Sequence, residues 1–370
     1  MEQVRATPAA DRDRSLDALK GFLIILVVLG HVPLKLFFSG LESSQEYLFI
    51  SRAIASLDIY FYHMPLFMAL GVFFIRSLSL REAKKHFMTI VVPFAFWRLI
   101  NLPLKFLATG LPGATNAIAG LVVGNFAFLG SPLWFLPALF ALKLIFGGGL
   151  ALRQRLPKTQ FSIVIVVATV LWSIYFYYSP VIAAYHVAGY IPWGIDIAVY
   201  LLPYAVIIRW LYLHAEKFKY SRLVAVAAII AGDLLISHFE AIKTISAFPA
   251  VIDLAQYSVA FTVPGFIGLI VMSGGILLLF RDTDPGLLLM RGFAFLGRYS
   301  FPIYLLSGLL IAEATKGLGF LFQHQPQVHN PMAVLLLTCL TILGLIAIPV
   351  VVSRLAMRVS TKFRYVGFTA

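Results

Sequence analysis

The first long apolar stretch of the chain reads Arg14-Ser-Leu-Asp17-Ala-Leu-Lys20-Gly21-Phe-Leu-Ile-Ile-Leu-Val-Val-Leu-Gly30-His31. It has the apolar character of a membrane-spanning helix, yet it carries ionisable side chains at both ends. Lys20 and His31 are separated by about three helical turns, so they share one face and lie about 16 Å apart along the axis. The stretch therefore predicts a helix with a cation near the membrane surface and a histidine at membrane depth.

The composition extends this prediction to the whole chain. Of 370 residues, 61% are hydrophobic and 12% are charged, and the mean hydropathy is +0.91. These values exclude a soluble domain. Apolar stretches of spanning length recur, and we predict an all-α, polytopic bundle of about ten transmembrane helices. The predicted spans cover residues 16–38, 57–75, 87–107, 133–146, 161–178, 191–213, 223–237, 257–280, 293–313 and 332–353.

The net charge of +13 comes from 29 Lys and Arg residues against 16 Asp and Glu residues. Such a charge invites a nucleic-acid partner, but the positions of the basic residues follow membrane topology instead. In the ten-helix topology both termini are cytoplasmic, and membrane lipids rather than nucleic acid are the expected partners. The basic clusters that fall on one side are at residues 5–20, 76–85, 153–158, 217–222, 281–298 and 354–364.

The rest of the chain offers little room for a separate domain. We expect cytoplasmic tails at residues 1–13 and 357–370 and one transmembrane domain over 14–356. A short surface helix is predicted within 39–56, and a glycine-rich, re-entrant or irregular segment within 109–131. The first span is interpreted as retained rather than as a cleaved signal, because no small-residue cleavage site follows it. The single cysteine, Cys339, excludes an internal disulfide and a cysteine-based metal site, and no metal is expected.

Two further ionisable residues lie in predicted spans. His63 precedes Met64-Pro65, where a proline frees carbonyl groups and a local cavity is expected. The alternative is an interfacial aromatic belt with a hydrated His63. Arg98 lies well inside the third span, where a guanidinium needs a partner or an anionic ligand. An ion pair with an aspartate, Asp233 or Asp196, is the alternative for Arg98.

Weaker candidates for substrate contact are Asn101, Trp134 and Tyr304. Taken alone, Trp134 and Tyr304 are the kind of residue that more often serves packing. Lys20 and His31 of the first helix also have structural alternatives. Lys20 can be a positive-inside anchor that extends to the headgroups, and His31 can be a neutral imidazole bonded to a neighbouring helix.

Taken together, four segments resemble the acyltransferase-3 family of integral-membrane O-acyltransferases, and within it the fucose 4-O-acetylase-like branch. The resemblance spans most of the chain in order. The segments are the first helix with Arg14, Asp17, Lys20 and His31, the Phe61-x-His63-Met-Pro-Leu-Phe stretch, Leu133-Trp-Phe-Leu, and Leu296-Gly-x-x-Ser300-x-x-x-Tyr304-Leu. The chain departs from the family at Lys20, where many members have arginine, at Ser307, where a histidine is common, and at Leu70, where a serine is common.

The resemblance implies a bacterial inner-membrane enzyme that moves an acetyl group from cytosolic acetyl-CoA to a sugar hydroxyl of an exopolysaccharide or its lipid-linked precursor. His31 is then the catalytic histidine, as general base or through an acetyl-His relay. Arg14 and Lys20 are expected to hold a phosphate of the donor. Asp17 would orient both cations, and His63 or Arg98 would stabilise the oxyanion.

Two other functions remain open at the level of the sequence. His31, His63 and Arg98 would also suit the polar pathway of a transporter or flippase for a lipid-linked sugar or small anion. A non-catalytic scaffold of a polysaccharide export complex is the third possibility. Consumption of acetyl-CoA separates the enzyme from both.

Overall fold

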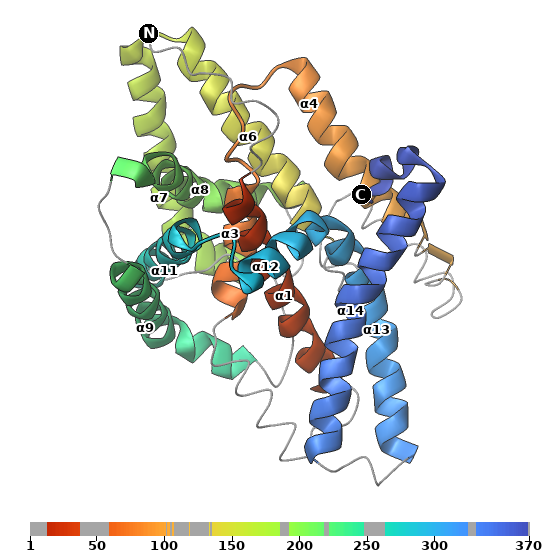
Figure 1. Ribbon diagram of the computed structural model, residues 1–370. Coiled ribbons are helices and arrows are strands. Elements are labelled where there is room, and N and C mark those ends of the chain that lie inside the picture. Colours follow the sequence, from red (N-terminus) through yellow and green to blue (C-terminus); the bar gives the residue numbers. More distant parts are fainter. Residues whose placement is uncertain are drawn as a thin grey trace.

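The computed structural model describes residues 13–37, 59–100, 102, 103, 106, 118, 133, 135–185, 192–217, 222–247, 263–324 and 331–368. The predicted surface helix within 39–56, and all but residue 118 of the segment within 109–131, lie outside this part of the chain. The described part is all-helical and contains no strand (Figure 1). Its main helices are α1 (Arg14–Phe37), α3 (Ile59–Leu70), α4 (Leu80–His86), α6 (Phe135–Arg155), α7 (Lys158–Tyr185), α8 (Ile195–His214), α9 (Arg222–Ala247), α11 (Val263–Asp282), α12 (Leu288–Arg298), α13 (Ser300–His324) and α14 (Pro331–Val359).

Short helical pieces join some of these elements. A π-helical turn, η1 (Phe87–Val91), continues α4 and leads into a helix up to residue 100. Two 3-10 turns, η3 (Pro192–Gly194) and η4 (Ala215–Lys217), flank α8, and η6 (Thr361–Val366) follows α14. The helix that leads into the predicted span 87–107 thus starts at Leu80, before that span begins.

Four described helices are long and apolar enough to cross a membrane: α6, α8, α11, and α14 over Leu336–Val359. The bent pair α12 and α13 would be a fifth span. The fold is therefore a bundle of apolar helices, as predicted. The count of about ten spans and the cytoplasmic placement of both termini remain predictions.

The predicted span over 293–313 is not one continuous helix but a bent pair, α12 and α13. The helices α12 and α13 are bent by 71° at Tyr299, whose φ is −102° and ψ is 8°. Pro302 explains the bend. It has no N–H to donate to the Arg298 carbonyl oxygen, and its ring would clash with that carbonyl in a continuous helix. The proline is visible in the sequence, but the prediction used only the length of the apolar stretch.

Glycines bring α1 and α12 into backbone contact. A Cβ atom at Gly21 would overlap the carbonyl oxygen of Phe293, and one at Gly297 would overlap the carbonyl oxygen of Asp17. Glycine is required at both positions, because any side chain would collide with the facing backbone. Small residues serve the same purpose at close helix crossings in other membrane proteins. The contact fixes the part of α1 that carries Asp17 and Lys20.

The same device joins α9 and α11, which lie side by side (Figure 1). A Cβ atom at Gly232 would lie 2.5 Å from the backbone nitrogen of Met272, and one at Gly275 would lie 2.6 Å from the Ala225 carbonyl oxygen. Elsewhere, α13 and α14 lie side by side (Figure 1). The turn η6 folds back to Trp97. The Trp97 indole donates a 2.8 Å hydrogen bond to the Val366 carbonyl oxygen.

Candidate functional site

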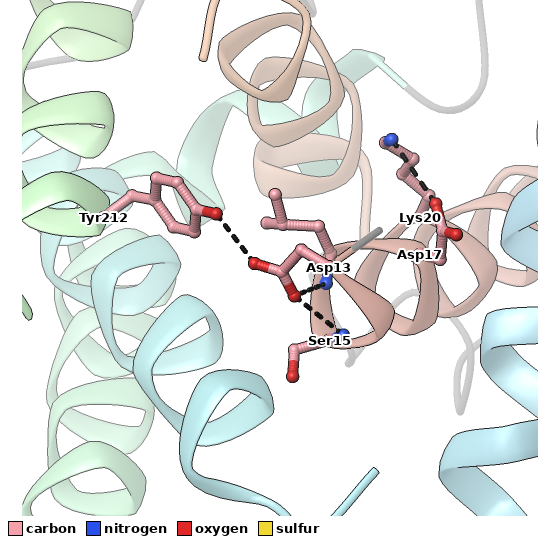
Figure 2. Close-up of polar contacts among 6 residues, drawn as sticks. Asp13, Ser15, Asp17, Lys20 and Tyr212 are labelled. Carbon is pink, nitrogen blue, oxygen red and sulfur yellow. Dashed lines mark hydrogen bonds and ion pairs between the residues drawn. The ribbon is translucent and has the colours of Figure 1, made fainter. Parts of the chain in front are cut away.

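Asp13 caps the start of α1 and ties it to α8. Its Oδ1 accepts hydrogen bonds from the backbone N–H groups of Ser15 (2.9 Å) and Leu16 (3.1 Å). Its Oδ2 accepts one from the Tyr212 hydroxyl at 2.7 Å, as Figure 2 shows. An aspartate at this position satisfies free N–H groups and balances the positive end of the helix dipole. The first turn of α1 is therefore held in place by a residue from a distant part of the chain.

The Asp17–Lys20 pair lies one turn further on. The Lys20 Nζ is 3.7 Å from Asp17 Oδ1, and the Asp17 side chain is 7% exposed against 30% for Lys20. In Figure 2, Lys20 projects away from the Tyr212 contact. The predicted pairing of Asp17 with Lys20 is thus present. Arg14, by contrast, is exposed and about 120° around the helix from Lys20.

Two arginines near Tyr212 make hydrogen bonds that link neighbouring segments. Arg209 donates from Nε to the Phe73 carbonyl oxygen (3.1 Å) and from Nη2 to that of Ile75 (2.8 Å). Arg281 donates to the Tyr212 carbonyl oxygen and pairs with Glu216 at 2.7 Å. We call Arg209 and Arg281 the arginine clamp. Each arginine donates hydrogen bonds to carbonyl or carboxylate oxygens of the protein, which is the pattern of structural arginines.

A second group of positive residues lies near Lys20. Lys143 of α6 is within electrostatic range of Lys20 and of Lys85 on α4. His86, also on α4, is within electrostatic range of Lys143. We call Lys20, Lys85, His86 and Lys143 the cationic cluster. The sequence prediction missed Lys143, although it is the only charged residue between Phe135 and Leu152, a signal of the same kind as Arg98.

Arg98 and Tyr304 meet at the other end of α6. Arg98 is 5% exposed, its guanidinium lies 5.4 Å from the Phe94 ring centroid, and Tyr304 is within its electrostatic range. The Tyr304 hydroxyl is hydrogen-bonded to the backbone of Phe135. Arg98 makes no ion pair with Asp233 or Asp196, and its Nε and Nη2 have no hydrogen-bond partner among the described residues. The structure therefore brings two predicted site residues together and corrects the ion-pair alternative.

His63 lies deeper along α3. Its side chain is 1% exposed, in a helix with Pro65 inside it. Phe67, one turn later, packs on Phe135 with ring centroids 6.2 Å apart, and Phe135 packs on Tyr304 at 5.5 Å. His63 is thus one helical turn from the layer of aromatic rings that borders Tyr304 and Arg98.

The depth of His31 follows from the continuity of α1. Lys20 and His31 belong to one unbroken helix, so the backbone at His31 is about 16 Å along the axis from Lys20. His63 lies about two helical turns before the end of α3 at Leu70. The side chain of His31, and Asn101 and Trp134 altogether, lie outside what the structure describes.

No group of three or more His, Cys, Asp or Glu residues in the described ranges is arranged to hold a metal ion. The polar side chains of the candidate site include cations, histidines and a tyrosine, besides the carboxylates of Asp13 and Asp17. Such groups suit binding of anions and proton transfer.

Comparison with protein families identifies the chain. A family model described as an acyltransferase domain, that of the acyltransferase-3 family, matches residues 13–349. The chain belongs to the acyltransferase-3 family. The match begins at the cap of α1 and ends within α14, so it includes every described residue of the candidate site. The resemblance inferred from the four motifs is confirmed, and the chain is a membrane acyltransferase by family.

Two curated proteins are similar over part of their length. Nodulation protein NolL of Mesorhizobium japonicum is 33% identical over 100 residues, which cover 26% of this chain and 25% of that protein. Nodulation protein NolL of Sinorhizobium fredii is 29% identical over 147 residues, 37% of each chain. The matches thus span about a quarter to a little over a third of these relatives. No solved structure matches the chain.

Proposed function

We propose that this acyltransferase transfers an acetyl group from cytosolic acetyl-CoA to a sugar hydroxyl of a bacterial exopolysaccharide or its lipid-linked precursor. His31 is the general base. The donor binds from the side of the cationic cluster, and the acceptor approaches from the far side of the bundle. In this proposal the chain resides in the bacterial inner membrane.

The observation that carries the proposal is α1 itself. One continuous helix, anchored by Asp13 at its start and by Gly21 and Gly297 against α12, joins a paired lysine to a histidine about three turns deeper. That separation is comparable to the length of a pantetheine arm. A thioester carried by such an arm would arrive at His31 when a phosphate of the donor rests on Lys20. The family membership supports the same chemistry.

The reaction balances in one step of addition and one of elimination. His31 takes the proton of the sugar hydroxyl as its oxygen attacks the thioester carbonyl. The resulting oxyanion collapses, the carbon–sulfur bond breaks, and the leaving sulfur receives the proton from His31. Arg98 beside Tyr304 is our candidate for stabilising the oxyanion, because its buried guanidinium has donors without a hydrogen-bond partner among the described residues.

The test is transfer of label from radiolabelled acetyl-CoA to cell-surface polysaccharide in membranes. We compare the wild-type chain with the His31→Ala variant and, as a matched control, with His214→Ala, since His214 lies at the end of α8 and bonds its own helix. Loss of incorporation in His31→Ala alone, at equal membrane expression, supports the proposal. Transfer that persists without His31 overturns its role, and no incorporation by any chain favours the transporter alternative.

A further inference from the structure

We propose that Lys143, together with Lys85 and His86, forms a second phosphate-binding element beside Lys20 that holds the phosphorylated end of the acyl donor. This inference rests on the proposed function for the identity of the donor. It assigns a role to three residues that the sequence motifs do not include. Its ligand chemistry is that of a phosphate mono- or diester.

The position of Lys143 is built by the fold. It is the single charged residue in the apolar first part of α6, and its Cε lies 3.5 Å from where a Cβ atom at Gly71 would be. This is an ordinary van der Waals distance, so the lysine stem lies beside the end of α3. The ammonium group is within electrostatic range of Lys20 on α1 and Lys85 on α4. Three separate elements thus contribute positive charge to one region.

The charges of this cluster are not balanced by the described part of the protein. Lys143 has no ion pair within 4.0 Å and no hydrogen bond among the described residues. Asp17 is paired with Lys20, which leaves Glu82 as the carboxylate within electrostatic range of Lys143. Lys20 and Lys143 are partly buried, and Lys85 is exposed. Like charges held close together repel one another, and a bridging polyanion lowers that cost.

His86 adds a directional hydrogen-bonding group. It is 9% exposed, and its Nε2 has no hydrogen-bond partner among the described residues. Buried polar atoms normally have a partner, so this nitrogen points to a ligand. Burial, and after it the charge of Lys143, lowers the pKa of His86, which lies outside the membrane-spanning helices. The lowered pKa favours the neutral imidazole, which can donate one N–H to a phosphate oxygen.

The chemistry of the ligand follows from these groups. Lysines act as point charges that suit phosphate, whereas a lone positive-inside lysine needs only water and headgroups around it. Coenzyme A carries a diphosphate and a 3′-phosphate at the end opposite the thioester. Lys20 and Lys143 approach from two helices, so two phosphate groups of one molecule can be held at once.

The kinetic experiment compares two donors that differ in phosphate. Wild type, Lys143→Gln and the control Lys84→Gln are assayed with acetyl-CoA and with acetyl-pantetheine, which has no phosphate. Lys84 is an exposed lysine on the same helix as Lys85 and is not among the charges that act on Lys143. We expect Lys143→Gln to raise the KM for acetyl-CoA about tenfold with kcat little changed. Its KM for acetyl-pantetheine should equal that of wild type.

Arginine at position 143 should restore most of the acetyl-CoA KM, because the positive charge is kept. An equal rise in KM for both donors, or no rise for acetyl-CoA, overturns the assignment. So does an effect of Lys84→Gln as large as that of Lys143→Gln.

Direct binding of radiolabelled coenzyme A separates the possible sources of phosphate. It is measured in detergent, in phosphatidylcholine nanodiscs and in phosphatidylglycerol nanodiscs. Coenzyme A binding that depends on Lys143 in all three supports the assignment. Loss of phosphatidylglycerol association in Lys143→Gln with unchanged coenzyme A binding overturns it in favour of a lipid headgroup.

The same data keep this inference apart from the proposed function. Lys143-dependent binding of coenzyme A by a chain that acetylates no acceptor supports the site and contradicts the transferase proposal. Acetyl transfer that is indifferent to Lys143 supports the transferase and contradicts the site.

Discussion

The arginine clamp and the cationic cluster are two positive regions close to the first turns of α1, and they differ in how their charges are satisfied. Arg209 and Arg281 donate to carbonyl oxygens and to Glu216, and their guanidinium groups lie over the rings of Phe146 and Tyr212 at 5.0 and 5.4 Å. Lys143 has no hydrogen bond or ion pair among the described residues. The buried Nε2 of His86 likewise has no hydrogen-bond partner among them.

This difference separates structural charge from charge that is kept for a ligand. A guanidinium that donates to protein carbonyl oxygens or pairs with a protein carboxylate stabilises the fold. An ammonium that is partly buried among other cations costs stability, and such a cost is typical of functional sites in membrane proteins. Composition cannot make this distinction, because it counts both regions equally in the charge of +13.

We expect the largest loss of stability when the backbone contact between α1 and α12 is disrupted. Replacing Gly297 by alanine places a methyl group on the carbonyl of Asp17, a backbone atom that cannot move aside. We expect little or no folded protein in detergent, seen as loss of the monodisperse peak in size-exclusion chromatography. Gly292→Ala is the control on the same helix, because a Cβ atom there meets nothing within 4 Å. A monodisperse Gly297→Ala protein would contradict the contact between α1 and α12.

The next effect concerns the clamp alone. Arg209→Met leaves the buried carbonyls of Phe73 and Ile75 without a donor, which we expect to cost about 2–3 kcal/mol of stability. The measurement is the thermal unfolding midpoint in detergent. The KM for acetyl-CoA of the folded fraction should be unchanged. Arg222→Met, which removes an arginine that is 61% exposed, is the control and should shift the midpoint little. A raised KM in Arg209→Met would remove the distinction between the two regions.

In the cationic cluster we expect a substitution to increase stability rather than decrease it. Lys143→Met removes a partly buried cation that has no ion pair among the described residues, so the ligand-free protein should gain about 1 kcal/mol of stability. Added coenzyme A should stabilise wild type more than this variant, because stabilisation by a ligand depends on its affinity. Thermal unfolding with and without coenzyme A measures both effects. Destabilisation of the ligand-free variant would show that Lys143 is structural.

The smallest effect is a pH dependence from His86. Because its pKa is lowered in the folded state, the unfolded chain binds the proton more readily, and stability falls as the pH drops below the unfolded value of about 6.5. The charged groups that act on it are Lys143, Glu82 and Lys85. In His86→Gln the unfolding midpoint should vary less between pH 7.5 and pH 5.5. An identical pH slope in wild type and variant would contradict this.

Parts of the fold and the site could be predicted from local sequence. The run from Arg14 to His31 is apolar enough to require a helix, and the spacing of Asp17 and Lys20 places them on one face, as the 3.7 Å pair shows. The motifs also suffice for the family. The break at Tyr299 was missed because apolar length continues through it, whereas the effect of Pro302 depends on backbone geometry.

The sequence by itself determined that this is an all-helical membrane protein of the acyltransferase-3 family, because hydrophobic length and local motifs suffice for both. Only the tertiary structure decided which charges are already satisfied. Asp13 is hydrogen-bonded to Tyr212, Arg98 is within electrostatic range of Tyr304, and Lys143 is within electrostatic range of Lys20, in each case across more than a hundred residues of chain. Contacts of such long range depend on how the helices cross, and glycines such as Gly21 and Gly297 set those crossings.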